Sequence, residues 1–359
     1  IANRFQVGLT EVGLLLAVWS ISGLTGSIIG GAMTDRFGRR FMLIFGLIFS
    51  AGTALLMGFA KNLAMFFWVL AFSGLLSDVG GPAQSAMVAD LLNEKQRPEG
   101  YGILRVSSNL AMVIGPAIGG MLAGISYMLL FILDAIASLI TATIVFFALP
   151  ETKPEIGGEQ SSESLLKTFK GYRRVAKDHL FIAFIIVSIV MIFVYTQMYS
   201  TLSVYLNKIH QVTPQRFGFI MSLNAFMVVT MQFWITRRVK QFEPMVILMA
   251  AVILYGIGFS LYGFVSTYAL FLLAMAIITI GEMLHIPVAQ GVVARFAPAH
   301  MRGRYMAVYG LSWAIPHTFG TLAAGLIMDH FDPNLVWFLG GGISLLAAAG
   351  FLGLHLKAK

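Results

Sequence analysis

Residues 30–40 read GGAMTDRFGRR, and this stretch decides how the rest of the chain is interpreted. It places Asp35 and three arginines, Arg36, Arg39 and Arg40, between two long apolar runs. Charged residues make up only 11% of the chain, so a cluster of this kind marks a point where the chain leaves an apolar environment. The stretch therefore predicts a water-exposed turn between two apolar helices.

The overall composition indicates a membrane protein. Hydrophobic residues make up 58% of the 359 residues, which leaves too little polar surface to cover a soluble globule of this size. The formal net charge of +8 would favour nucleic acid as a partner of a soluble protein, but here the basic residues form short clusters between apolar runs. We therefore expect a lipid bilayer and no nucleic acid. Because the chain has no cysteine, disulfides and thiolate metal sites are excluded, and we expect neither a metal nor a cofactor.

Eleven segments are long and apolar enough to cross the membrane, since a hydrocarbon core of about 30 Å takes about 20 helical residues. They cover residues 11–34, 41–60, 64–89, 101–124, 126–149, 180–206, 214–236, 244–265, 268–292, 304–328 and 334–356. The sequence therefore predicts an all-α membrane protein with eleven spans.

The basic residues predict the orientation of these spans. Of the 24 Lys and Arg residues, 20 fall on the side that holds residues 36–40, and four fall on the other side: Arg4, Lys61, Lys208 and Arg216. By the positive-inside rule the richer side is cytoplasmic. We predict a multi-pass protein of the cell membrane with a cytoplasmic C-terminus, in which residues 30–40 are the first cytoplasmic loop.

An internal repeat relates the two halves of the chain at an offset of 205 residues. PAQSAMVAD at 82–90 and PVAQGVVAR at 287–295 share Pro, Val and Ala in register, and the offset recurs from Arg97 to Arg302, from Gly115 to Gly320 and from Gly120 to Gly325. Both copies run in the same direction through the membrane, as in parallel repeats about an axis along the membrane normal. The repeat predicts two six-helix bundles with pseudo-twofold symmetry, at 1–149 and 179–359, joined by a charged cytoplasmic linker at 150–178.

The first bundle is expected to be incomplete. Shifted back by the repeat offset, the span at 180–206 corresponds to positions that end where the chain begins, at Ile1. We therefore predict that the first helix of the first bundle is missing from this sequence.

Two motifs resemble those of the major facilitator superfamily. The loop pattern G-x-x-x-D-R-x-G-R-R is matched by Gly31, Asp35, Arg36, Gly38, Arg39 and Arg40. The helix-five pattern G-P-x-x-G-G, frequent in its proton-coupled drug exporters, is matched by Gly115, Pro116, Gly119 and Gly120. LPET at 149–152 is similar to the usual exit from helix six. The resemblance covers the whole chain and implies transport by alternating access.

The resemblance implies a gating role for the loop. Asp35 is expected to engage the second half near the start of the span at 304, where the helix amides carry partial positive charge. For Arg39 and Arg40 we favour a role in topology. Lys240 stands at the repeat position of Asp35, so we expect a one-sided latch. Arg105 is interpreted as a gating residue, a snorkelling anchor or an ion-pair partner of Asp90.

Acidic residues inside the spans are candidates for proton coupling, because lipid does not tolerate unpaired charge. Glu282 and Asp78 both lie near mid-depth, and the repeat places Glu282 opposite Ser77, next to Asp78. His285 follows Glu282 by three residues, on the same helical face, and titrates near neutral pH when unperturbed. Asp134 is closer to the outer end of its span and is interpreted as a structural or entrance residue.

Polar and aromatic side chains on the spans suggest a substrate cavity lined by Tyr195, Gln197, Tyr199, Asn224, Trp313 and His317. Rings offer cation–π contacts and acids offer counter-charge, which suits hydrophobic or cationic substrates. Packing between helices is the alternative for each aromatic residue.

These patterns predict a monomeric secondary transporter, most simply a proton-coupled exporter of drug-like or metabolite molecules. The alternative of the same fold is a proton-coupled uptake permease for a sugar, organic acid or peptide. An enzyme is not expected, since the sequence has no HExxH, GxSxG or phosphate-binding loop. A non-transporting sensor built on a transporter fold is a further alternative.

Overall fold

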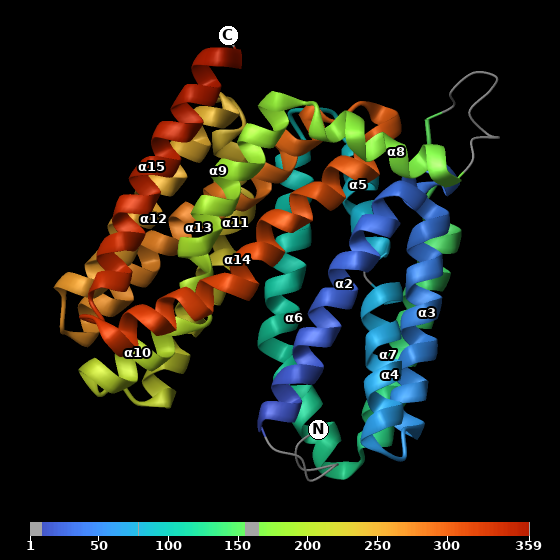
Figure 1. Ribbon diagram of the computed structural model, residues 1–359, viewed down its shortest axis with the longest axis horizontal. Coiled ribbons are helices and arrows are strands. Elements are labelled where there is room, and N and C mark those ends of the chain that lie inside the picture. The colour runs from blue at the N-terminus through green and yellow to red at the C-terminus, as the bar shows by residue number, and fades with distance from the viewer. Residues whose placement is uncertain (1–8, 78, 155–164, 359) are drawn as a thin grey trace. The chain divides into compact units, whose positions relative to one another are not determined.

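The computed structural model of the chain describes residues 9–77, 79–154 and 165–358 (Figure 1). Within these ranges the backbone forms helices and connecting turns, with no strand. The predicted all-α class is therefore confirmed for the part of the chain that the structure describes.

Figure 1 shows the helices of the described ranges. In chain order they are α2 (Leu9–Phe37), α3 (Arg39–Phe59), α4 (Leu63–Ser77), α5 (Gly80–Leu91), α6 (Arg97–Ile125), α7 (Tyr127–Ala148), α8 (Leu165–Ala176), α9 (His179–Tyr195), the 3₁₀ turn η2 (Thr196–Met198), α10 (Thr201–His210), α11 (Pro214–Val239), α12 (Pro244–Phe264), α13 (Tyr268–Phe296), the 3₁₀ turn η3 (Ala299–Met301), α14 (Arg302–His330) and α15 (Leu335–Ala358).

Nine segments of the described chain are long and apolar enough to cross a membrane. They match nine of the predicted spans, with α4 and α5 together forming one of them, at Leu63–Leu91. The predicted spans at 11–34 and 101–124 fall within α2 and α6, which are helical but are not among the nine. The predicted count of eleven is therefore not confirmed.

The predicted span at 180–206 is interrupted. Helix α9 ends at Tyr195, and α10 begins at Thr201 after the turn η2. Polar side chains account for the break, because they bond to nearby main-chain carbonyls instead of leaving the helical ladder alone. Gln197 Nε2 donates to Phe193 O at 2.8 Å, and Ser200 Oγ donates to Thr196 O at 3.1 Å.

The described chain forms two compact units, each built from separate segments. Unit 1 comprises residues 1–91, 114–176 and 296–310, and unit 2 comprises residues 92–113, 177–295 and 311–359. Both units therefore contain residues from each predicted half of the chain. The predicted division into bundles at 1–149 and 179–359 with a linker at 150–178 stays a prediction.

In unit 1, helix α2 packs on α4 and α5, and α3 packs on α7. A buried cluster between these helices contains Leu15, Met57, Phe66 and Leu70. The other face of α7 leaves large apolar side chains exposed, with Phe147 80% accessible. Such a surface is compatible with lipid and would be a liability in water.

In unit 2, helices α12 and α15 lie side by side (Figure 1). Small residues allow this contact, since a Cβ on Gly256 would stand 3.0 Å from the side chain of Ser344. A Cβ on Gly341 would stand 2.0 Å from Ser260 Oγ. Close packing through small residues is the usual way in which helices associate in a bilayer.

Candidate functional site

A glycine forms the turn between α2 and α3. Gly38 has φ of +108°, a backbone conformation that residues with a side chain rarely adopt. The carboxylate of Glu151 occupies the adjacent space and accepts hydrogen bonds from Arg39 N–H at 2.8 Å and Arg40 N–H at 3.2 Å. Glu151 therefore caps the start of α3, where a helix favours negative charge.

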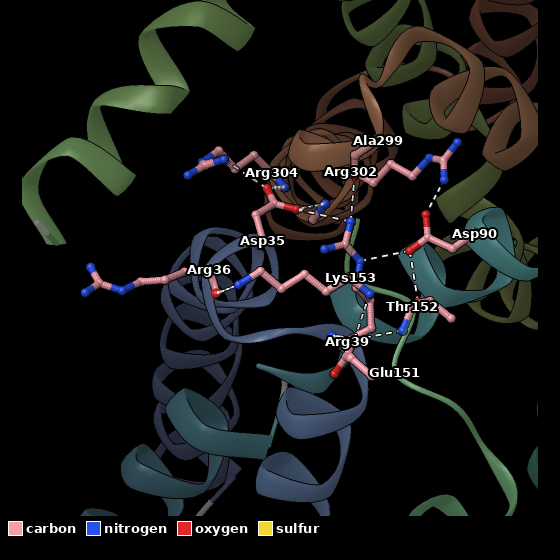
Figure 2. A network of polar contacts seen from close by, with 11 residues as sticks. Asp35, Arg36, Arg39, Asp90, Glu151, Thr152, Lys153, Ala299, Arg302 and Arg304 are labelled. Atoms are coloured by element: carbon pink, nitrogen blue, oxygen red, sulfur yellow. Dashed lines mark hydrogen bonds and ion pairs between the residues drawn. The ribbon is translucent and has the colours of Figure 1, made fainter. Parts of the chain in front are cut away.

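The last turn of α2 carries Asp35, which contacts the start of α14 (Figure 2). Its Oδ1 accepts from Gly303 N–H at 2.9 Å, and its Oδ2 accepts from Arg304 N–H at 3.1 Å. The Arg304 guanidinium also donates to Oδ2, at 3.1 Å. The Asp35 side chain is 2% exposed. Backbone amides in the first turn of α14 therefore supply hydrogen bonds that water would otherwise make to the carboxylate.

Two glycines bring α2 and α14 together. A Cβ on Gly31 would lie 2.6 Å from Gly303 O, and a Cβ on Gly303 would lie 2.4 Å from Gly31 O. Gly31 is one turn before Asp35 on the same face of α2. The glycine of the motif therefore permits the close approach on which the Asp35 contact depends.

Arg39 joins several segments of unit 1 and is completely buried. Its Nε donates to Asp90 Oδ2 at 2.8 Å, and its Nη2 donates to Ala299 O at 2.7 Å. Asp90 also accepts from the Arg302 guanidinium and, at 3.0 Å, from Thr152 Oγ1 (Figure 2). The topology role favoured from the sequence does not account for this burial, because a residue that only marked the cytoplasmic side would remain in water.

The other two arginines of the motif lie at the edge of this network. Arg40 donates to Phe146 O, and its guanidinium stands 4.8 Å from the centre of the Phe146 ring. Lys153 Nζ donates to Arg36 O at 2.6 Å. These contacts attach the last turn of α7 to the start of α3, and the residues after α7 to the end of α2.

Helix α8, which lies in the predicted linker, also contacts α2. The Tyr172 hydroxyl donates to Ile28 O of α2. Burial raises the pKa of this phenol, the charge of Asp35 raises it further, and the Arg304 guanidinium acts in the opposite direction. Tyr172 therefore stays protonated and remains a hydrogen-bond donor to α2.

A second polar cluster, in unit 2, surrounds Glu282. The carboxylate of α13 is completely buried and forms an ion pair with Arg105 of α6. Its Oε1 also accepts from the Tyr195 hydroxyl, and its Oε2 accepts from Asn224 Nδ2 at 2.5 Å. Four helices thus supply one carboxylate and three donors, and we call this set of four residues the Glu282 cluster.

Three neighbours extend the Glu282 cluster. The hydroxyls of Tyr195 and Tyr199 are 3.2 Å apart, and Trp313 meets the Tyr195 ring edge-on at 5.6 Å between ring centres. Asn224 Nδ2 also donates to Thr279 Oγ1 at 3.0 Å. Four of the six predicted cavity residues, Tyr195, Tyr199, Asn224 and Trp313, therefore lie together beside Glu282, while their role in binding substrate stays a prediction.

Three other predicted site residues lie apart from the Glu282 carboxylate. His285 contacts the rings of Tyr255 and Phe351, and its Nε2 has no hydrogen-bond partner in the described part of the chain. Gln197 Oε1 accepts from Thr201 Oγ1 at 2.6 Å. His317 stacks on Trp313 at 6.4 Å between ring centres. The proton-relay role expected of His285 stays a prediction.

The partner of Arg105 differs from the one proposed on sequence grounds. Asp90 pairs with Arg39 and Arg302, whereas Arg105 pairs with Glu282. Helix α6 begins at Arg97 instead of at residue 101, so Arg105 lies more than two turns inside it. Of the three alternatives for Arg105, the ion pair with Asp90 is therefore not the one in the structure, while a gating role stays a prediction.

The remaining candidates are Asp78, Asp134 and the helix-five motif. Asp78 lies outside the described residues, as do the side chain of Pro116 and the surroundings of Gly120. Around Gly115 and Gly119, no described atom comes within 4 Å of the position that a Cβ would take. Asp134 is exposed on α7.

The polar network around Arg39 contains residues that the sequence patterns do not indicate. The sequence suggests Asp90 only as a partner of Arg105, and it assigns no role to Glu151 or Arg302. The repeat offset contains a signal for Arg302, because it pairs this residue with Arg97. Only the folded chain shows that both Arg302 and Arg39 donate to Asp90.

Comparison with known proteins gives a consistent assignment. A family model described as Major Facilitator Superfamily matches residues 1–321. The chain is 26% identical to a Na⁺, Li⁺, K⁺/H⁺ antiporter of Planococcus maritimus, over 94% of the chain and 84% of that protein. It is 27% identical to multidrug resistance protein 1 of Bacillus subtilis, over 100% of the chain and 92% of that protein.

Solved structures agree on the fold. The crystal structure of the human organic anion transporter MFSD10 superimposes with a TM-score of 0.81, covering 94% of this chain and 83% of that one, at 19% sequence identity. At this identity the likeness shows the shared fold alone.

Proposed function

The chain belongs to the major facilitator superfamily, a family of membrane transporters, and on that premise we propose that it is a proton-coupled exporter of drug-like or metabolite molecules. The relatives support this choice, since one is named as a cation/H⁺ antiporter and another as a multidrug resistance protein. The proposal places the chain in the cell membrane as a monomer with a cytoplasmic C-terminus.

The Glu282 cluster carries the proposal. A carboxylate that is completely buried and paired with a guanidinium is costly to place in a membrane and points to function. Arg105, Tyr195 and Asn224 all donate to an ionised carboxylate. Protonation of Glu282 would remove the negative charge that these three donors stabilise, so proton uptake would weaken their contacts and favour a rearrangement of the side chains.

We propose that the residues that donate to Glu282 also couple proton binding to substrate binding. Tyr195 contacts both Glu282 and Trp313, which joins the carboxylate to the aromatic side chains proposed to bind substrate. A cationic or polar substrate that approaches the ionised carboxylate competes with Arg105 for it. Protonation removes that attraction and releases the substrate, which is the sequence of events that exchange requires. Asp78 is proposed as a second acid on the same proton pathway.

The Asp35 contact supplies the gate in this proposal. It joins α2 to the first turn of α14 through two backbone amides and one guanidinium. Alternating access requires a contact that forms in one state and breaks in the other, with a matching change in free energy. We assign that role to Asp35 together with Gly31 and Arg304.

Transport in proteoliposomes under an imposed pH gradient tests the proposal. An antiporter accumulates substrate when the lumen is acidic, because protons leave as substrate enters, and this holds for either orientation of the protein. The probes are a set of lipophilic cations and neutral metabolites, with protein-free vesicles as the control.

Each alternative has its own outcome. Accumulation only when the lumen is alkaline would replace export with proton-coupled uptake. Substrate binding without accumulation under either gradient would favour the sensor and overturn both transport readings.

A further inference from the structure

A salt bridge in unit 2 stands where the repeat places the counterpart of the gate. Lys240 directly follows α11, and its Nζ lies 2.8 Å from Glu99 Oε1. Glu99 is the third residue of α6, in the first turn of that helix. The pair therefore joins the end of one helix to the start of another, as Asp35 and Arg304 do.

The repeat relates the two pairs residue by residue. The offset of 205 carries Asp35 to Lys240 and Glu99 to Arg304. In the first pair the acid lies at the end of its helix and the base at the start of the partner helix, whereas in the second pair the base lies at the end and the acid at the start. We infer that Lys240 and Glu99 form a second, charge-reversed gate pair, so that the latch is two-sided, contrary to the sequence-based expectation. This inference rests on the proposed gating role of Asp35.

The sequence gives a reason for the exchange. The position that corresponds to Gly303 is Pro98, which has no N–H to donate. Asp35 accepts two backbone N–H groups, and one of them comes from Gly303. A carboxylate at position 240 would lose that donor, whereas the ammonium group of Lys240 needs an acceptor, which Glu99 provides.

The charge reversal makes the two pairs respond differently to opening. Asp35 lies at the C-terminal end of α2 and Arg304 at the N-terminal end of α14, so each charge opposes its own helix dipole and depends on the other. Lys240 at the end of α11 and Glu99 at the start of α6 both match their own helix ends. Breaking the second pair therefore costs less than breaking the first.

Exposure to solvent weakens the second pair further. The Lys240 side chain is 37% exposed, whereas that of Asp35 is 2% exposed. A cavity of about 250 Å³ adjoins Lys240 and is also lined by Pro98, Pro244 and Arg295. By the repeat, Pro244 stands at the position of the buried Arg39, so this position supplies no guanidinium to the pair. The Lys240–Glu99 pair thus stabilises the closed state less than the Asp35 contact does.

Charge exchange tests the inference. The variants are Lys240→Glu, Glu99→Lys and the double variant that restores the pair in reverse. The chain has no cysteine, so spin labels are placed without background. Phe41→Cys and Val246→Cys are suitable sites, since both side chains are exposed and the repeat makes them equivalent. The distance distribution between the labels reports the open and closed populations of the cytoplasmic side.

Each single variant should increase the open population by about two- to threefold, as expected for losing an exposed ion pair and adding repulsion. The double variant should return it to the native value. Lys95→Glu is the control, because it makes the same charge change on the same side, and Lys95 takes part in none of the ion pairs of the described chain.

The result that overturns the inference is a double variant that adds the two single effects instead of cancelling them, or a control with an equal effect. Asp35→Asn, measured with the same labels, keeps the two proposals distinguishable. If Asp35→Asn leaves the open and closed populations unchanged, the gating role of Asp35 fails. If Asp35→Asn changes these populations but the Lys240 and Glu99 variants leave them unchanged, only the second pair fails.

Discussion

Arg304 donates to Asp35 twice, from its backbone N–H and from its guanidinium, and both hydrogen bonds reach Oδ2 at 3.1 Å. The other oxygen, Oδ1, accepts from the N–H of Gly303. These donors are all on the first two residues after Arg302, so one movement of α14 would break them together. Such a contact acts on a conformational equilibrium more than on substrate affinity.

Asp35→Asn should therefore slow turnover by about tenfold while changing substrate affinity less than about twofold, because the amide replaces one acceptor with a donor that faces other donors. The measurement is the transport rate beside equilibrium binding in detergent. Asp329→Asn, an exposed acid on α14, is the matched control. A native rate with altered affinity would remove the latch from the mechanism.

The gate shows which parts of a site a sequence predicts. The motif placed Asp35 near the start of the span at 304, and the structure has this contact. Arg39 was not predicted as a buried residue, because a basic residue in a cytoplasmic cluster looks the same whether it faces water or a carboxylate. Its partner Asp90 lies 51 residues away, and only packing of the helices brings the two together.

Arg39→Lys should destabilise the protein by about 2 kcal/mol, because one ammonium group cannot reach both Asp90 and Ala299 as the planar guanidinium does. Thermal unfolding in detergent measures this loss. Arg237→Lys, at an exposed position at the end of α11, should leave the melting temperature unchanged. Equal melting temperatures for the two variants would mean that the Arg39 network contributes no stability.

Gly38→Ala should also destabilise, by about 1–3 kcal/mol, since alanine is strained at φ of +108°. Its Cβ would also stand 2.4 Å from Glu151 Oε2. Gly52→Ala within α3 meets no atom within 4 Å and should be neutral or stabilising by about 0.5–1 kcal/mol. The comparison uses the same unfolding assay, and a shift of equal sign for both variants would contradict the role of the backbone conformation.

The Glu282 cluster was predicted only in part. The depth of Glu282 in its span indicates a functional acid, and helical spacing places Tyr195 and Tyr199 on one face. Neither pattern shows that Arg105 of α6 faces Glu282 of α13. His285 shares a helical face with Glu282, yet in the structure its ring lies against Tyr255 and Phe351. Spacing along one helix places neighbours on a face, whereas contacts between helices decide which polar groups bond.

Glu282→Gln should abolish accumulation driven by a pH gradient while leaving exchange of a neutral substrate, because the amide keeps the size of the side chain but cannot titrate. Transport with the gradient imposed in each direction, beside exchange without a gradient, separates these two activities. Asp78→Asn should give a milder version of the same defect. Glu243→Gln, at an exposed acid before α12, is the matched control and should transport like the native protein.

The single variant Glu282→Gln leaves the buried charge of Arg105 without a partner, which should destabilise the folded protein. The double variant Glu282→Gln with Arg105→Gln removes both charges and should recover expression while remaining uncoupled. Because the two residues act as one unit, its coupling defect should be no larger than that of Glu282→Gln alone. If the double variant accumulates substrate against a gradient at the native rate, proton coupling resides outside the Glu282 cluster, and Asp78 is the next acid to test.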